Sequence, residues 1–138
     1  MDFTMNPVTR GNSGAEFRKA DLHVHTPGSY DYEADISPED LVDAFVEEGL
    51  ELVVAADHNR TGWFDELQDA AEERAEELQI LPGVEITTPQ GGDNQIHLVG
   101  IFPPQKVDEI TALLHTISID PTDPSSTQAS QRIPEICS

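Results

Sequence analysis

A continuous apolar run at residues 52–56 (LVVAA) lies between two segments with helical periodicity, and it constrains the fold more than any other feature. Such a run is typical of a strand that is buried on both faces, as in a parallel sheet covered by helices. The segment before it starts with a capping Ser37 and Pro38 at the first helical position, and it ends at Gly49. The segment after it, residues 61–78, has its apolar residues on one side. These patterns predict an α/β fold.

Further strands are expected at residues 20–26, 80–86 and 96–102, and a third helix at residues 107–117. The order is then strand, helix, strand, helix, strand, strand, helix. Alternation of this kind predicts mainly parallel strands covered by helices. We therefore expect about four strands and three helices in one domain, residues 20–118.

The two ends of the chain differ from this domain in composition. Residues 1–19 are polar and are expected to form a flexible lead-in, whereas residues 119–138 form a Pro/Ser/Thr-rich tail, expected to be loose or truncated. Residues 91–94 (GGDN) predict a turn. No stretch approaches the roughly 20 apolar residues of a membrane span, and no secretory signal precedes the domain, so a cytoplasmic location without a membrane partner is expected. The lone Cys137 excludes a disulfide scaffold.

The charge of the chain is strongly negative, with 27 Asp and Glu residues against 7 Lys and Arg residues and a net charge of -20. Phosphate backbones are held by clustered Lys and Arg, so the charge disfavours nucleic acid as a partner except as a substrate end. The acidic runs are interpreted as solvated helix faces. A second hypothesis is a halophilic source, because concentrated salt screens the repulsion between surface carboxylates.

His23 and His25 are two residues apart on the first expected strand. This spacing puts both side chains on one face, about 6.6 Å apart along the chain. Two imidazoles placed in this way can converge on one metal ion. The alternative interpretation is a pair of polar residues on the solvent face of an edge strand.

Other metal-binding residue types follow at the ends of the later strands. His58 comes after residues 52–56, Glu85 lies near the end of the third strand, and His97 lies inside an apolar strand, where a core role is the alternative. Asp31 lies in the loop after the first strand. Parallel α/β sheets gather such positions at the carboxyl ends of their strands. We therefore predict one metal site from these residues: His23, His25, Asp31, His58, Glu85 and His97.

The residue types also limit the chemistry. Imidazole together with carboxylate suits Zn, Mn or Fe better than Ca or Mg alone. The Glu85 carboxylate can bridge two ions through its two oxygens, and paired ions can activate water for attack at phosphorus. Asp57 and Arg60 are the candidate catalytic residues beside this cluster. Arg60 could hold a phosphate oxygen, although an exposed loop arginine is an equally good interpretation.

Four segments together resemble the polymerase and histidinol phosphatase (PHP) domain family. They are residues 21–26 (DLHVHT), 56–59 (ADHN), 82–86 (PGVEI) and 97–100 (HLVG), and they occur in the family's order. The opening residues 17–23 also look like the start of PHP domains that are fused ahead of an ATPase. The resemblance covers roughly residues 20–102.

The resemblance implies a distorted seven-stranded, TIM-like (β/α) barrel with a phosphoesterase site of two or three divalent ions. It implies that Glu85 bridges ions that His23, His25 and His97 also bind. It further implies that Asp31 and His58 hold the third ion, with Asp57 orienting His58. The substrate would be a phosphate ester.

The chain departs from the family after His97. The later histidine strand and the final Asp-x-His of the family have no counterpart, and the next histidine, His115, lies on a helical segment. An incomplete barrel of about four strands is therefore expected, either as the N-terminal piece of a longer protein or completed by a partner chain or a second copy. Such a chain could be inactive alone.

Two alternatives to the phosphoesterase hypothesis remain. One is a degenerate metal-binding module that docks onto a larger ATPase or polymerase. The other is an amidohydrolase, whose barrels also begin with an HxH strand, although residues 56–59 and 83–85 fit that family poorly.

Overall fold

A computed structural model describes residues 17–29, 31–88, 96–117 and 119–120 of the chain. Most of the expected lead-in (1–19) and tail (119–138), together with the expected turn (91–94), lies outside these residues. The division of the chain into a domain with two loose ends therefore remains a proposal.

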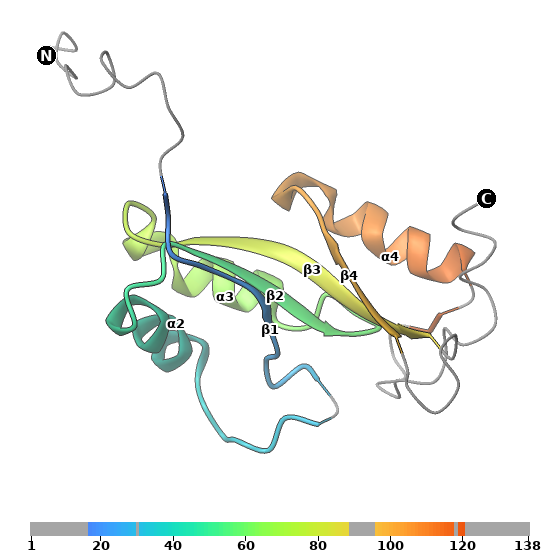
Figure 1. The fold of residues 1–138 in the computed structure, drawn as a ribbon, viewed down its shortest axis with the longest axis horizontal. Coiled ribbons are helices and arrows are strands. Elements are labelled where there is room, and N and C mark those ends of the chain that lie inside the picture. The colour runs from blue at the N-terminus through green and yellow to red at the C-terminus, as the bar shows by residue number, and fades with distance from the viewer. Residues whose placement is uncertain (1–16, 30, 89–95, 118, 121–138) are drawn as a thin grey trace, which may run out of the picture.

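The order of the elements agrees with the sequence analysis (Figure 1). The elements are β1 (Ala20–Val24), α2 (Pro38–Glu47), β2 (Leu52–His58), α3 (Phe64–Ala70), the 3-10 turn η2 (Glu72–Arg74), β3 (Gln79–Thr88), β4 (Ile96–Ile101), the 3-10 turn η3 (Pro104–Lys106) and α4 (Val107–Thr116).

The strands form one sheet in the order β1-β2-β3-β4. β1, β2 and β3 are parallel, and β4 runs antiparallel to β3. The pairing of β2 with β3 is continuous from Leu52 opposite Gln79 to His58 opposite Glu85. The predicted fold class is confirmed: an α/β, mostly parallel, curled part of a TIM-like barrel with three helices.

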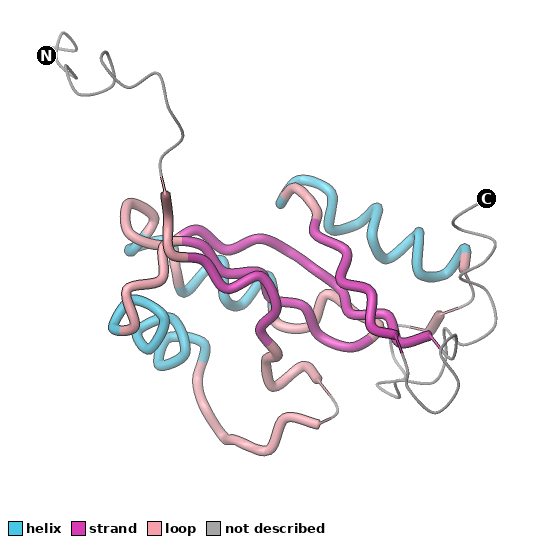
Figure 2. Tube along the Cα trace, in the orientation of Figure 1, coloured by secondary structure: helices cyan, strands magenta, loops and turns pink. Residues whose placement is uncertain are grey.

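The larger core lies between the sheet and the first two helices. Val53 and Ala55 of β2 are fully buried against this layer. The helices contribute Leu41, Val42 and Phe45 from α2, and Phe64 and Leu67 from α3. Figure 2 shows both helices close to the strands that they cover. These are the apolar stripes that the periodicity of the two segments predicted.

The other face of β2 is also buried, because Val54 and Ala56 have no exposed surface. Gly83 of β3 makes this close packing possible. A Cβ atom at Gly83 would lie 2.6 Å from Val54 Cγ1 and 3.0 Å from the Gly100 carbonyl oxygen. The interpretation of residues 52–56 as a strand buried on both faces is confirmed.

A smaller core lies between α4 and the second half of the sheet. Val84 of β3 packs with Ile110 and Leu114 of α4 and with Ile117 and Ile119 after it. Figure 1 shows α4 beside β3 and β4, away from α2 and α3. Within the described residues, no helix has the length and apolar character that crossing a bilayer would require.

The predicted helix at residues 61–78 is wrong in its extent. The structure contains a short α3, the 3-10 turn η2, and then turns up to Leu78. Like-charged residues four positions apart destabilise a helix. Glu72 and Glu76 form one such pair, and Glu73 and Glu77 form another. A continuous helix would place each pair of carboxylates side by side.

The strand around His97, which the sequence analysis described as apolar with a core histidine as one alternative, is largely exposed. β4 is one of the two edge strands of the described sheet, and β1 is the other. Ile96 is 49% exposed, Leu98 41% and Ile101 44%. In the part of the chain that the structure describes, β4 pairs with a neighbouring strand on one side only, and these apolar side chains are open to solvent.

The N-cap of α2 offers a direct test of the local structure. The Ser37 hydroxyl oxygen accepts a hydrogen bond from the Asp40 N–H at 3.1 Å. We expect Ser37→Ala to lower the free energy of unfolding by about 1 kcal/mol, because the N–H loses its partner. Ser37→Thr keeps the accepting oxygen and serves as the control. Urea denaturation of both variants measures the difference, and equal stabilities would contradict the capping role.

Candidate metal centre

The strands bring the predicted ligands to one end of the sheet. His23 lies on β1 and His25 follows its last residue, while His58 and Glu85 face each other in the register of β2 and β3. His97 comes from the beginning of β4, not from a strand end. Because β4 is antiparallel, its amino end lies beside the carboxyl end of β3, where His97 pairs with Thr87.

The Glu85 carboxylate is the centre of this cluster, and the residue is 1% exposed. Its Oε2 atom lies 2.7 Å from His23 Nε2 and 2.6 Å from His25 Nε2. His58 Nε2 lies 3.5 Å from the same oxygen. His97 contacts the other oxygen, Oε1, through its Nδ1 atom. Four histidines that are scattered in the sequence thus surround one buried carboxylate.

Asp31 lies beside this centre, on the long segment between β1 and α2. Its Oδ1 atom is 3.3 Å from His25 Nδ1 and 3.6 Å from His58 Nδ1. Three groups of ligand atoms come close enough together for a shared ion, and each group has three members. They are His23, His25 and Glu85; His25, Asp31 and His58; and His58, Glu85 and His97.

The arrangement fits a divalent cation. Ligand atoms bonded at about 2.0–2.1 Å in a tetrahedron stand about 3.3 Å from one another. The Nε2 atoms of His23 and His25 are 3.1 Å apart and face the same oxygen of Glu85. Imidazole and carboxylate ligands of this kind suit Zn, Mn or Fe.

Asp57, next to His58 in the sequence, is fully buried. Its Oδ1 atom accepts a hydrogen bond from the Thr26 N–H at 2.7 Å, and its Oδ2 atom accepts one from the Thr26 hydroxyl at 2.5 Å. The carboxylate of Asp57 therefore holds the turn that follows β1. The resemblance implied that Asp57 orients His58, which stays a prediction, whereas these two hydrogen bonds of the carboxylate come from Thr26.

The sequence analysis missed two residues of this region, Thr26 and Ser29. Both are buried, and the Ser29 N–H donates to the Thr26 carbonyl oxygen at 2.8 Å. The Ser29 hydroxyl lies 3.0 Å from His58 Nδ1 and accepts a bond from the His58 N–H at 3.2 Å. The available signal was their position in the loop directly after the two histidines of the first strand.

Burial changes the acid–base behaviour of three of these residues. Desolvation lowers the pKa of His58, and the nearby His25 lowers it further, although Asp31 acts in the opposite direction. The pKa of His23 is also lowered, by desolvation and then by His25. Desolvation raises the pKa of Asp57, which the hydrogen bonds from Thr26 partly counteract. Lowered histidine pKa values favour the unprotonated rings that a metal needs.

We expect the metal-free protein to lose stability as the pH falls below the ordinary histidine pKa of 6.5. Below that pH the unfolded chain binds protons that the folded His58 and His23 resist, so the unfolded state binds more protons. Their stabilising contribution is complete above 6.5 and is lost as the pH falls through the lower folded values.

Urea denaturation in EDTA between about pH 8 and about pH 5 measures this slope. The raised pKa of Asp57 acts in the opposite direction, since that contribution is lost as the pH rises above 3.8 and through the folded value. His58→Gln removes one of the titrating rings and should flatten the slope. An equally steep slope in this variant would contradict the assignment to His58.

Arg60 follows β2 in the loop that begins with Asn59, which has a φ of 60°. The Arg60 side chain is partly buried. Its Nε atom is buried and has no hydrogen-bond partner among the described residues. Such a group is available for an anion, as the sequence analysis expected of Arg60.

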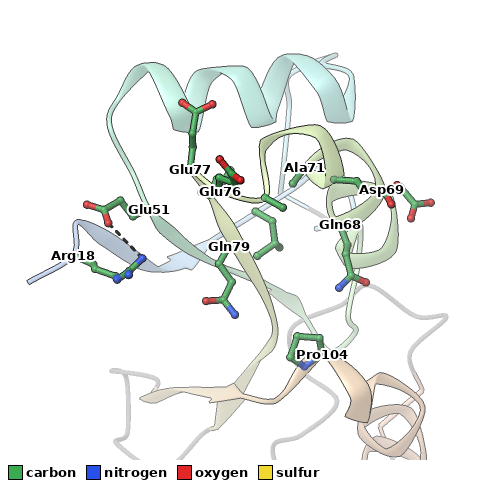
Figure 3. Close-up of a pocket in the computed structure, with 13 residues that line it drawn as sticks. Arg18, Glu51, Gln68, Asp69, Ala71, Glu76, Glu77, Gln79 and Pro104 are labelled. Atoms are coloured by element: carbon green, nitrogen blue, oxygen red, sulfur yellow. Dashed lines mark ion pairs between the residues drawn. The ribbon is translucent and has the colours of Figure 1, made fainter. Parts of the chain in front are cut away.

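A cavity in the described part of the chain lies elsewhere. It has a volume of about 560 Å³ and is lined at the amino ends of β2 and β3 by residues that include Glu51, Leu78 and Gln79. Arg18 and Glu51 form an ion pair of 3.7 Å at its edge (Figure 3). The predicted metal ligands lie at the carboxyl ends of these strands, so the cavity is separate from the candidate metal centre.

The fold and this cluster define the class of protein: an α/β part-barrel with a histidine and carboxylate centre of the kind found in metal-dependent hydrolases. The family model of the PHP domain matches residues 21–136. The chain therefore belongs to the PHP domain family, as the four motifs indicated.

Individual relatives agree with this assignment. The chain is 34% identical over 99 residues to a 5'-3' exoribonuclease of Haemophilus influenzae, covering 72% of this chain and 34% of that protein. It is similar to the crystal structure of a protein from Bifidobacterium adolescentis assigned as a metal-dependent phosphoesterase, with a TM-score of 0.54, 31% identity and coverage of 73% and 33%.

A third relative is an amidohydrolase from Chromobacterium violaceum, solved with bound sulfate and no metal. The TM-score is again 0.54, with 28% identity and coverage of 72% of this chain and 33% of that one. The chain thus spans about a third of the length of the relatives it matches.

Proposed function

We propose that this chain carries a metal-dependent phosphoesterase site that binds two or three divalent ions. The observation that carries the proposal is the convergence of His23, His25 and His97 on the buried Glu85 carboxylate. The protein's membership of a family of metal-dependent hydrolases supports it. Divalent ions, when bound, supply an activated water and neutralise the charge of a phosphate.

The residues of the chain have separate roles in this proposal. His23, His25, His97 and Glu85 hold metal, with the two oxygens of Glu85 facing different histidines. Asp31 and His58 hold a further ion, and they form one ligand group together with His25. Asp57 keeps the surrounding loop in place. Exclusion of water from Glu85 strengthens its attraction for a cation.

Arg60 is proposed to bind a phosphate oxygen of the substrate. Its buried Nε atom, which has no hydrogen-bond partner among the described residues, supports this role. The relative named as an exoribonuclease makes a nucleic-acid end one candidate for the phosphate ester. A net charge of -20 disfavours a long duplex bound over the protein surface.

The test is metal-dependent hydrolysis by the purified chain. We expect p-nitrophenyl phosphate to be hydrolysed after addition of Mn²⁺ or Zn²⁺, and EDTA to abolish the reaction. His25→Ala removes a metal-facing nitrogen, whereas His115→Ala, an exposed histidine on α4, is the matched control. If wild type binds ions but His25→Ala is as active as His115→Ala, the proposed site is wrong.

Two further substrates separate the remaining possibilities. Release of nucleotides from a short oligoribonucleotide would place the substrate at nucleic-acid ends. Cleavage of a p-nitroanilide amide without cleavage of the phosphate ester would instead favour the amidohydrolase alternative, which the name of one relative keeps open.

The second candidate function is a metal-binding module that docks onto another protein or a second copy, which would complete the barrel. The exposed apolar residues of the edge strand β4 favour it. Bound ions without hydrolysis, together with a larger particle mass by light scattering that Leu98→Glu reduces, would support this function.

A further inference from the structure

We propose that Asp57 is a positioning residue that acts through Thr26, holding the turn after β1 so that Ser29 and Asp31 meet His58. The inference rests on the proposed function, because it concerns the group formed by His25, Asp31 and His58.

The first step is the strength of the link between Asp57 and Thr26. Both residues are fully buried, and Thr26 donates two hydrogen bonds, one to each carboxylate oxygen. A charged acceptor makes such bonds roughly twice as strong as neutral ones. Burial of a carboxylate costs free energy, and hydrogen bonds from donors such as Thr26 offset that cost. The Asp57–Thr26 link therefore fixes the start of the turn on the end of β2.

The second step is the space around Asp57. A Cβ atom at Gly28 would lie 2.8 Å from Asp57 Oδ2 and 2.8 Å from the Gly62 Cα atom. The turn after β1 and the loop before α3 thus approach each other over this one carboxylate. Their closeness leaves the turn little freedom to shift while Asp57 keeps its position.

The third step leads from the turn to the ligands. The Thr26 hydroxyl also accepts a bond from the Gly28 N–H at 3.0 Å, and the Ser29 N–H closes the turn on the Thr26 carbonyl. Ser29 then contacts His58 Nδ1 at 3.0 Å. Asp31 follows two residues later, 3.6 Å from the same nitrogen. Loss of the hydrogen bonds from Thr26 would therefore loosen Ser29 and Asp31, the two residues beside the His58 imidazole.

This arrangement predicts that Thr26 and Asp57 affect one ion more than the others. Outer partners that orient metal ligands typically contribute about 10–100-fold to affinity. The group of His23, His25 and Glu85 has its own direct contacts on β1 and β3. A change at Thr26 should therefore weaken the ion that depends on Asp31 and leave the ion of the group His23, His25 and Glu85 largely unchanged.

The experiment measures Mn²⁺ binding to the whole chain by equilibrium dialysis, with Asp31→Ala defining the dependent ion. We expect Thr26→Val to bind that ion about 10–100-fold more weakly. Thr26→Ser retains the hydroxyl and should bind the ion as wild type does. Thr111→Val makes the same change on α4 and is the control. The double variant Thr26→Val, Asp31→Ala should lose no more than Asp31→Ala alone.

A second measurement does not depend on metal. In EDTA, hydrogen exchange at the Ser29 amide should be faster in Thr26→Val and in Asp57→Asn than in wild type, because its partner is the Thr26 carbonyl. Asp57→Asn keeps the shape of the side chain and serves if Thr26→Val folds poorly.

Wild-type Mn²⁺ affinities in both variants, or an equal weakening of every ion, would overturn the positioning role while leaving the proposed function intact. A wild-type chain that binds no Mn²⁺ or Zn²⁺ would overturn both.

Discussion

Glu85→Gln is expected to abolish tight metal binding, and with it any hydrolysis. Both carboxylate oxygens face imidazole nitrogens, so Glu85 belongs to two of the three ligand groups. The amide keeps the size of the side chain but loses the charge that attracts a cation. Since even outer partners of ligands contribute about 10–100-fold, removal of this central charge should weaken binding by at least about 100-fold.

The measurement is the metal content of the dialysed protein by elemental analysis, with hydrolysis measured in parallel. Glu66→Gln on α3 makes the same change on an exposed residue and should keep the wild-type content. Circular dichroism of both variants in EDTA excludes unfolding as the cause. A Glu85→Gln protein that retains a full complement of ions would remove Glu85 from the metal centre.

The fold could be predicted from the sequence where local pattern and global structure agree. Residues 52–56 are apolar on both faces of the strand, and β2 is indeed buried on both faces. Ser37, Pro38 and Gly49 mark the ends of α2 because capping depends on a few neighbouring residues. The extent predicted for α3 was wrong because the acidic residues that follow it were interpreted as a solvated helix face. Their mutual repulsion, which disfavours a continuous helix, was not considered.

The edge position of β4 depends on pairing between distant parts of the chain. Nothing in residues 96–102 distinguishes an edge strand from a central one, since charges and prolines that usually protect an edge are lacking within β4. The sequence analysis accordingly kept a core role for His97 as an alternative. Pairing on one side only makes the difference, and local sequence does not contain that information.

The candidate site was predicted residue by residue, but its internal links were not. Strand order explains why His58 and Glu85 meet, because they are opposite each other in parallel strands. The contact between Asp57 and Thr26 does not follow from the register of paired strands. It depends on the path of the turn after β1, and threonine in a loop is too common to indicate a buried hydrogen bond.

Gly62→Ala is expected to be the most destabilising small substitution in the loop beside this site. Gly62 has a φ of 55°, and a Cβ atom there would lie 1.5 Å from Asp57 Oδ2. The left-handed backbone costs a residue with a Cβ about 1–2 kcal/mol. Displacement of the Asp57 carboxylate from its Thr26 donors adds about 1–3 kcal/mol. The free energy of unfolding should fall by about 3 kcal/mol in total.

Gly49→Ala separates the two contributions. Gly49 also has a left-handed backbone, with a φ of 72°, but a Cβ atom there would meet nothing within 4 Å. Its cost should therefore be the backbone part alone, about 1 kcal/mol once the lower entropy of the unfolded alanine chain is included. Urea denaturation of both variants in EDTA gives the difference. Equal losses would mean that the carboxylate of Asp57 does not occupy the space beside Gly62, and the anchoring of the turn by Asp57 would lose its basis.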